Sequence, residues 1–148
     1  ELALICDIVV ADETALFGMP EATIGIIPGA GGTQRLVRAI GKSMAMEMIL
    51  AGRRLDAREA KACGLISSIA ADGRPIADHA LEIAERIAQA APLAVTMAKA
   101  AILESFEAPL SAGIRFERSL SALITASDDR AEGMRAFAAK EPPLFTGQ

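Results

Sequence analysis

Several residue types are scarce or missing in this sequence of 148 residues. Trp and Tyr are absent, and His occurs once, at position 79. The formal net charge is −4, and like charges form no long block. Nucleic-acid-binding proteins use basic stripes and stacking aromatic side chains. The sequence therefore predicts no DNA or RNA partner.

Cysteine is almost as scarce. Cys6 and Cys63 have no metal-ligand spacing such as C-x-x-C, and a single His cannot build a His-rich site. We therefore expect neither a disulfide framework nor a metal site, and two isolated thiols fit a reducing, cytoplasmic compartment.

Long apolar runs are missing too, although 52% of the residues are hydrophobic and the mean hydropathy is +0.35. Asp7, Lys99 and Glu104 interrupt the longest runs before they reach the roughly 18 apolar residues of a spanning helix. The sequence predicts no membrane association. The apolar excess indicates tightly packed helices and buried subunit surfaces.

The first half of the chain has a mixed pattern. The apolar run from Leu2 to Val10 predicts a strand covered on both faces, and shorter strands are predicted at 15–17 and 65–69. The glycine-rich segment 25–32 predicts neither helix nor strand. Helices are predicted at 33–40, 43–50 and 57–63, the last with Asp56 and Glu59 as a capping box.

From residue 72 the pattern is helical throughout. Helices are predicted from about 76, from Pro92 to about 106, from Pro109, and from a cap at Ser127 or Asp128. The segment after Pro92 has small or apolar residues on nearly all sides, which predicts a buried helix, whereas His79 lies on a polar face and is predicted at the surface. The chain thus divides into an α/β region, 1–71, and a helical region, 72–148.

The glycine-rich loop matches no nucleotide-binding motif. Gln34 stands where G-x-G-x-x-G needs its last glycine, and Leu36 stands where a P-loop before Gly41-Lys42-Ser43 needs its first. Two interpretations stay open. The bare amides of the loop approach a ligand at a helix N-terminus near Thr33, or the loop is a purely structural turn.

Two acids flank this region. Glu21 follows Pro20 among apolar residues, where burial would raise its pKa and suit it to proton transfer. The alternative is a solvated turn acid or a helix cap. Glu1 taken alone carries a weaker signal.

Three segments in this order resemble the enoyl-CoA hydratase/isomerase (crotonase) family. They are ELALICD at 1–7, FGMPE at 17–21 and GIIPGAGGTQRL at 25–36. The similarity continues through 41–43, 57–65 and the tail DDRAEGMRAFAAK at 128–140, so it covers nearly the whole chain.

The resemblance implies a fold and an assembly. The family fold is a spiral of ββα units followed by a helical trimerisation region, which would place the last part of the spiral, with its catalytic acids, at 1–71 and the trimerisation and CoA-contacting helices at 72–148. A family Gly-Gly-Gly-x segment precedes the position of Glu1, so we expect this chain to be the C-terminal half of a subunit. The expected assembly is a homo-oligomer, either a trimer or a dimer of trimers.

The resemblance also implies a reaction, the reversible addition of water to trans-2-enoyl-CoA in fatty-acid β-oxidation, catalysed by a lyase. Glu1 matches the base that activates the water and Glu21 the acid that protonates C2, while Gly29 matches a glycine whose amide positions the water. No separate cofactor is implied, because the coenzyme A thioester is the substrate.

Further positions concern coenzyme A and the oxyanion. Phe137 and Lys140 match tail positions that reach the CoA of a neighbouring subunit, and the two oxyanion-hole amides belong to family positions before Glu1. Two residues depart from the family pattern. Met19 replaces a Gln found beside the first acid in some members, and Ser121 replaces a Phe that contacts CoA.

Two other functions stay open. One is a Δ3-Δ2-enoyl-CoA isomerase of the same superfamily, in which one acid can suffice. The other is a non-catalytic assembly and CoA-contact module, for which the 148 residues alone would be inactive.

Overall fold

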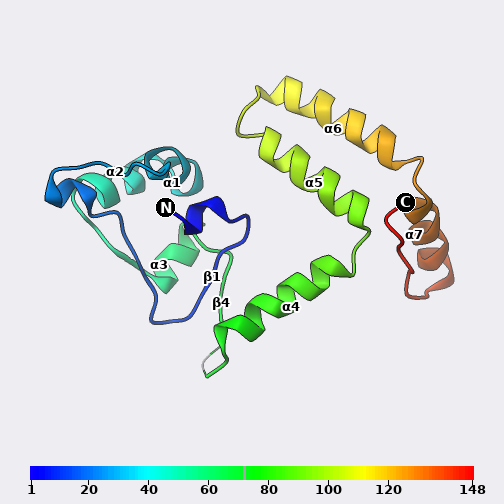
Figure 1. Ribbon diagram of the computed structural model, residues 1–148, viewed down its shortest axis with the longest axis horizontal. Coiled ribbons are helices and arrows are strands. Elements are labelled where there is room, and N and C mark those ends of the chain that lie inside the picture. The colour runs from blue at the N-terminus through cyan, green and yellow to red at the C-terminus, as the bar shows by residue number, and fades with distance from the viewer. Residues whose placement is uncertain (72) are drawn as a thin grey trace. The chain divides into compact units, whose positions relative to one another are not determined.

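A computed structural model describes residues 1–71 and 73–148. These residues form two compact units, Glu1–Leu81 and Glu82–Gln148, and the division falls inside helix α4 (Ile76–Ala88). Figure 1 labels strands β1 and β4 before α4 and helices α5, α6 and α7 after it. The last strand, β4 (Ser68–Ile69), precedes α4.

The first unit alternates short strands with helices. Their order is η1 (Ala3–Ile5), β1 (Val10–Ala11), β2 (Leu16–Phe17), η2 (Glu21–Ile24), α1 (Gly32–Ile40), α2 (Lys42–Leu50), β3 (Leu55–Asp56), α3 (Ala57–Ala62) and β4, where η marks a 3-10 helix. Strand β1 pairs in parallel with β4, and β2 pairs antiparallel with β3. Both pairs join segments that are far apart in the sequence.

The core of the first unit is formed by one face of each helix. Leu36 of α1, Met48 of α2 and Leu55 of β3 are each at most 1% exposed. Ala45 and Ala60 are fully buried beside them, and their small side chains let the backbones approach. Burial of a side chain of Leu or Met size stabilises the fold by about 1.5 to 3 kcal/mol. This core holds the start of α1 in place.

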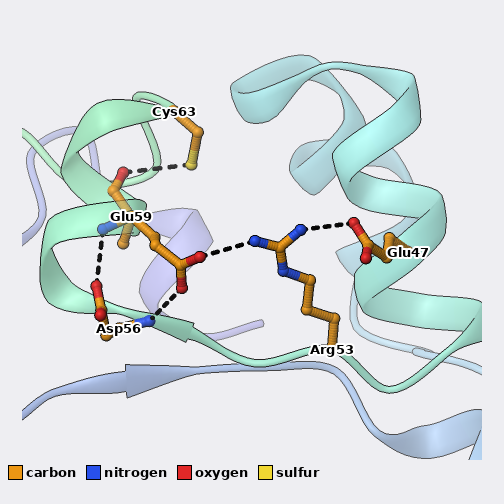
Figure 2. Close-up of polar contacts among 6 residues, drawn as sticks. Glu47, Arg53, Asp56, Glu59 and Cys63 are labelled. Atoms are coloured by element: carbon orange, nitrogen blue, oxygen red, sulfur yellow. Dashed lines mark hydrogen bonds and ion pairs between the residues drawn. The ribbon is translucent and has the colours of Figure 1, made fainter.

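Helix α3 begins with the predicted capping box (Figure 2). The Asp56 carboxylate accepts the Glu59 N–H at 2.8 Å, and the Glu59 carboxylate accepts the Asp56 N–H at 3.1 Å. Arg53 donates to Glu59 and to Glu47 of α2, each at 2.7 Å. The capping box is therefore confirmed, and Arg53 ties α2 to α3.

The strand predicted from Leu2 to Val10 is wrong over most of its length. Residues Ala3–Ile5 form a 3-10 turn, and only Val10–Ala11 pair with β4. A strand needs a neighbouring backbone for its hydrogen bonds, and β4 is itself only two residues long. Leu2 and Ile5 are exposed, so this segment is not covered on both faces.

His79 of α4 also differs from the prediction. Its ring is half-buried, and Nε2 lies 2.8 Å from the Ser68 hydroxyl of β4. The prediction of a surface residue is wrong because α4 turns this side chain toward β4.

The second unit continues with α5 (Pro92–Glu104), α6 (Leu110–Ile124) and α7 (Asp128–Ala139). Their predicted starts are confirmed, with Pro92 in the first turn of α5 and the Ser127 hydroxyl accepting the Arg130 N–H at the start of α7. The prediction that α5 is buried is wrong. Helix α6 covers one side of it, and apolar side chains such as Ile102 and Leu103 stay exposed.

A helix that spans a bilayer needs about 20 predominantly apolar residues. Within residues 1–71 and 73–148, no single helix is long and apolar enough to cross a membrane. Helices α4 and α5 satisfy the length and composition together, across a bend of 109°.

The C-terminal residues fold back along α7. Asp129, only 2% exposed, accepts the N–H groups of Thr146 at 2.6 Å and Gly147 at 2.8 Å. The Phe145 ring lies where a side chain on Gly133 would make van der Waals contact. A buried carboxylate with two N–H donors is satisfied, so Asp129 anchors the tail to the helix.

Candidate active site

The glycine-rich loop ends at the first turn of α1. Residues 26–31 are neither helix nor strand, as predicted, and α1 begins at Gly32. Gly31 precedes it with φ of 98°, in the left-handed region that favours glycine. Free N–H groups at the start of a helix attract negative charge.

That negative charge is the Glu1 carboxylate. Its Oε1 accepts the Ala30 N–H at 2.8 Å and the Gly32 N–H at 2.7 Å. The Gly32 amide has the largest effect and, with the Ala30 amide, lowers the pKa of Glu1 below its ordinary value. Hydrogen bonds to the charged form favour it. Glu1 is thus held as a carboxylate with a fixed orientation.

The position of Gly32 requires a residue without a side chain. A Cβ there would lie 2.9 Å from Oε1 of Glu1 and 2.7 Å from the Met19 sulfur. Met19, only 5% exposed, stands beside the acid where some family members have Gln. Backbone amides therefore supply the hydrogen bonds that orient Glu1.

Glu1 also lines a small cavity of about 60 Å³. Its other walls are mostly apolar and include Leu4, Phe17, Met19 and Leu36. This volume exceeds the roughly 10–15 Å³ that a single water needs. The arrangement places an ionised carboxylate beside space for water, which is what a general base for hydration requires.

Glu21 is the first residue of η2 in the first unit. Its side chain is half-buried, and among the described residues the buried Oε2 has no hydrogen-bond partner. Buried polar oxygens normally have partners, so this oxygen is available to a ligand. Within the described part of the chain, Glu21 is not among the residues lining the cavity beside Glu1.

Gly29 precedes the two amides that hold Glu1. Its backbone makes a smaller contribution to the lowered pKa of Glu1. The space where its Cβ would lie is empty to 4 Å in the described residues. Packing there does not by itself require glycine.

Phe137 lies in α7, and Lys140 caps the C-terminal end of this helix. The Phe137 side chain is 84% exposed, and Lys140 ends the helix with φ of 57°, a left-handed conformation. Both side chains are open to a ligand. Ser121 lies on the surface of α6, in a groove between α5 and α6 that Met97 and Leu120 also line.

Sequence reasoning left out the residues that hold Glu1. The sequence left open whether the loop amides approach a ligand or form a structural turn. In the structure the Ala30 and Gly32 amides bind the Glu1 carboxylate of the chain itself. The run of glycines leading into a helix signalled free amides, and only the fold shows what they bind. Arg35 was also missed, although its guanidinium donates to the Ala30 carbonyl at 2.9 Å. Three-residue clusters of possible metal ligands are absent from residues 1–71 and 73–148.

Comparison with known proteins gives consistent matches. All 148 residues match the family model for enoyl-CoA hydratase/isomerase. The chain is 47% identical over its whole length to 2,3-dehydroadipyl-CoA hydratase of Escherichia coli, and 45% identical to a mitochondrial enoyl-CoA hydratase of Pongo abelii. It covers 58% and 51% of these proteins, so it spans about half the length of the curated relatives it matches.

Solved structures agree. A crystal structure of enoyl-CoA hydratase from Bacillus anthracis superimposes with a TM-score of 0.93 at 42% identity, over 99% of this chain and 57% of that one. An enoyl-CoA hydratase from Mycobacterium tuberculosis gives 0.93 at 35% identity, over 99% and 58%. The expected α/β crotonase-like fold is confirmed. By sequence and by structure, this chain belongs to the enoyl-CoA hydratase/isomerase family.

Proposed function

We propose that the protein containing this chain is an enoyl-CoA hydratase, which adds water reversibly to trans-2-enoyl-CoA and gives 3-hydroxyacyl-CoA. One observation carries the proposal: the Glu1 carboxylate is kept ionised by two amides beside a cavity large enough for water. The hydratase names of relatives 45% to 47% identical support the same reaction.

In the proposed step, Glu1 takes a proton from water as the water oxygen forms a bond to C3. The C2–C3 π electrons move toward C2 and the thioester carbonyl, and Glu21 gives a proton to C2. The product has gained one water. Afterwards the protonated Glu1 releases one proton to solvent, and the Glu21 carboxylate takes up one proton from solvent. Both acids are then back in their starting states. General acid-base catalysis of this kind contributes about 10²- to 10⁴-fold to a rate.

The reaction uses no resident cofactor, because coenzyme A enters as part of the substrate. We assign Gly29 to positioning the water through its backbone amide, and Phe137 and Lys140 to contacts with coenzyme A across subunits. An exposed aromatic ring and a nearby ammonium group suit an adenine ring and a phosphate.

We further propose a homo-oligomer, either a trimer or a dimer of trimers. Apolar side chains of the second unit support it, because Ile102, Leu110 and Leu123 are each more than 60% exposed. Exposed apolar surface of this extent is typical of a subunit interface. A cytoplasmic location and a role in β-oxidation complete the proposal. The free thiols of Cys6 and Cys63 suit a reducing compartment.

The test is hydration of crotonyl-CoA by the full-length protein and its Glu1→Gln and Glu21→Gln variants. Each variant should lose about 10²- to 10⁴-fold in kcat, because Gln keeps the shape and cannot exchange the proton. Glu13→Gln is the control, since Glu13 makes only a 3.5 Å surface ion pair with Arg58. Undiminished activity in Glu21→Gln contradicts the hydratase mechanism. An inactive wild type points to the assembly and CoA-contact module.

A further inference from the structure

The peptide groups of the loop alternate in direction around Glu1. The N–H groups of Ala30 and Gly32 point to its carboxylate. The peptide between them, which joins Ala30 to Gly31, has its carbonyl bonded to Nη1 of Arg35 at 2.9 Å. In a trans peptide the C=O and N–H point in opposite directions. The Gly31 N–H therefore points away from Arg35. The angles on either side of this middle peptide, ψ of Ala30 and φ of Gly31, help to set the directions of the two flanking N–H groups relative to one another.

This part of the loop has little stiffness of its own. Gly31, with φ of 98°, can adopt other conformations at almost no steric cost. A rotation about ψ of Ala30 or φ of Gly31 that the other angle does not compensate turns one of the two flanking amides away from Glu1. A restraint outside the loop is needed to keep one orientation.

Arg35 supplies that restraint from two sides. Its backbone N–H donates to the Gly31 carbonyl at 2.9 Å, and its guanidinium donates to the Ala30 carbonyl. The guanidinium lies in the space that the missing side chain of Gly31 leaves, because a Cβ on Gly31 would collide with Nη1. The Arg35 guanidinium can therefore occupy this space only because residue 31 is glycine.

We propose that Arg35 is a positioning residue for hydration: it fixes the Ala30–Gly31 peptide so that the Ala30 and Gly32 amides stay aimed at the Glu1 carboxylate. Its effect on rate rests on the proposed function, whereas its effect on the loop does not. Arg35 acts through the loop, so its loss changes the chemical step and leaves substrate binding intact.

The test compares Arg35→Met, Arg35→Lys and Arg38→Met in the full-length protein. Met keeps an unbranched aliphatic side chain and removes the N–H donors, while Lys keeps a positively charged donor group. Arg38 is the matched control, since it lies on the same helix and its guanidinium donates to the Gln34 carbonyl. Two quantities are measured: kcat and KM with crotonyl-CoA, and hydrogen exchange of the Ala30 and Gly32 amides.

Arg35→Met should lower kcat about tenfold with KM unchanged, and it should speed exchange of both amides about tenfold, as expected for a lost hydrogen bond from a charged group. Arg35→Lys should recover most of both, and Arg38→Met should change neither. The proposal is overturned if Arg35→Met has the kcat and the amide exchange rates of the wild type. It is also overturned if Arg38→Met loses as much kcat as Arg35→Met. If the wild type does not hydrate crotonyl-CoA while exchange still responds to Arg35→Met, the proposed function fails and the positioning role stands.

Discussion

Glu1 combines two properties that a general base needs, a proton-free carboxylate and a fixed aim. Two backbone amides provide both at once, because they stabilise the negative charge and define where the second carboxylate oxygen points. Backbone donors do not depend on side-chain identity. The replacement of a family Gln by Met19 therefore leaves the carboxylate with its partners.

The ionisation of Glu1 is directly measurable. The Gly32 and Ala30 amides lower its pKa, so its carboxyl ¹³C resonance should titrate with a midpoint below the ordinary value of 4.5. The group then stays ionised as pH falls through 4.5 and takes up its proton only at lower pH. Glu1→Gln identifies the resonance. A midpoint at or above 4.5 contradicts the observed hydrogen bonding.

Gly32→Ala tests the close contact around the same group. The new Cβ would lie 2.9 Å from Oε1 of Glu1 and 2.7 Å from the Met19 sulfur, so the carboxylate must move. A displacement of about 1 Å can cost a factor of about 10² in rate, and we expect a loss of that order in kcat for crotonyl-CoA. The control is Gly113→Ala in α6, where the described residues leave the Cβ position open to 4 Å. Equal kcat in Gly32→Ala and Gly113→Ala would contradict the claim that Glu1 needs a residue without a side chain at position 32.

At the scale of elements, the helices and two short strands followed from the sequence, since β2 and β4 lie within the predicted ranges 15–17 and 65–69. The long strand predicted from Leu2 to Val10 did not form. Asp56, Pro92 and Ser127 mark helix starts through local chemistry, since a cap needs only its own first turn. The strand predicted from Leu2 depended on a distant partner that an apolar run does not specify. The burial predicted for α5 likewise depended on neighbouring helices. The exposure of His79 depended on the direction in which α4 packs.

The capping box of α3 should have a measurable effect on stability. Asp56→Ala removes the acceptor for the Glu59 N–H, and an N-cap loss of this kind typically lowers the free energy of unfolding by about 1 kcal/mol. Asp56→Asn keeps an acceptor and should restore most of it. Urea unfolding of the full-length protein measures both. Equal destabilisation by Asn and Ala would show that the cap is not the cause.

The C-terminal tail should respond to acid through Glu132. Arg135, and then the Leu144 amide, lower the pKa of Glu132 to about 2 from 4.5. A lowered folded-state pKa means that its stabilising effect is complete above pH 4.5 and is lost as pH falls toward 2. Hydrogen exchange of residues 141–148, measured relative to the intrinsic rate at each pH, should therefore speed up across this interval in the wild type. In Glu132→Gln it should already be fast at pH 6, and a slow tail there contradicts the prediction.

At the scale of the whole molecule, the two acids that we propose as catalytic, Glu1 and Glu21, belong to the first unit, and α5 and α6 with their exposed apolar side chains belong to the second. The resemblance to the family pointed to Phe137 and Lys140, and it gave Glu1 and Glu21 their roles, whereas the apolar surroundings of Glu21 had already singled it out. The amides that hold Glu1, the cavity beside it and the contact with Arg35 come from packing between η1, α1 and the loop, which no local pattern encodes.

The apolar surface of the second unit predicts association. Sedimentation equilibrium of the full-length protein should give three or six times the subunit mass, because α5 and α6 expose side chains such as Ile102 and Leu123 that water disfavours. The control is the same experiment over a range of concentrations, which separates a stable assembly from weak aggregation. A monomer at micromolar concentration contradicts the prediction.

Isotope incorporation from solvent distinguishes water addition from a shift of the double bond. Full-length protein is incubated with crotonyl-CoA in water enriched in both ¹⁸O and deuterium, and the product is analysed by mass spectrometry and NMR. Hydration by Glu1 and Glu21 predicts 3-hydroxybutyryl-CoA with one heavy oxygen on C3 and one deuterium on C2, and it predicts loss of both labels in Glu1→Gln and Glu21→Gln. A shifted double bond with no heavy oxygen, or an unchanged substrate, contradicts it.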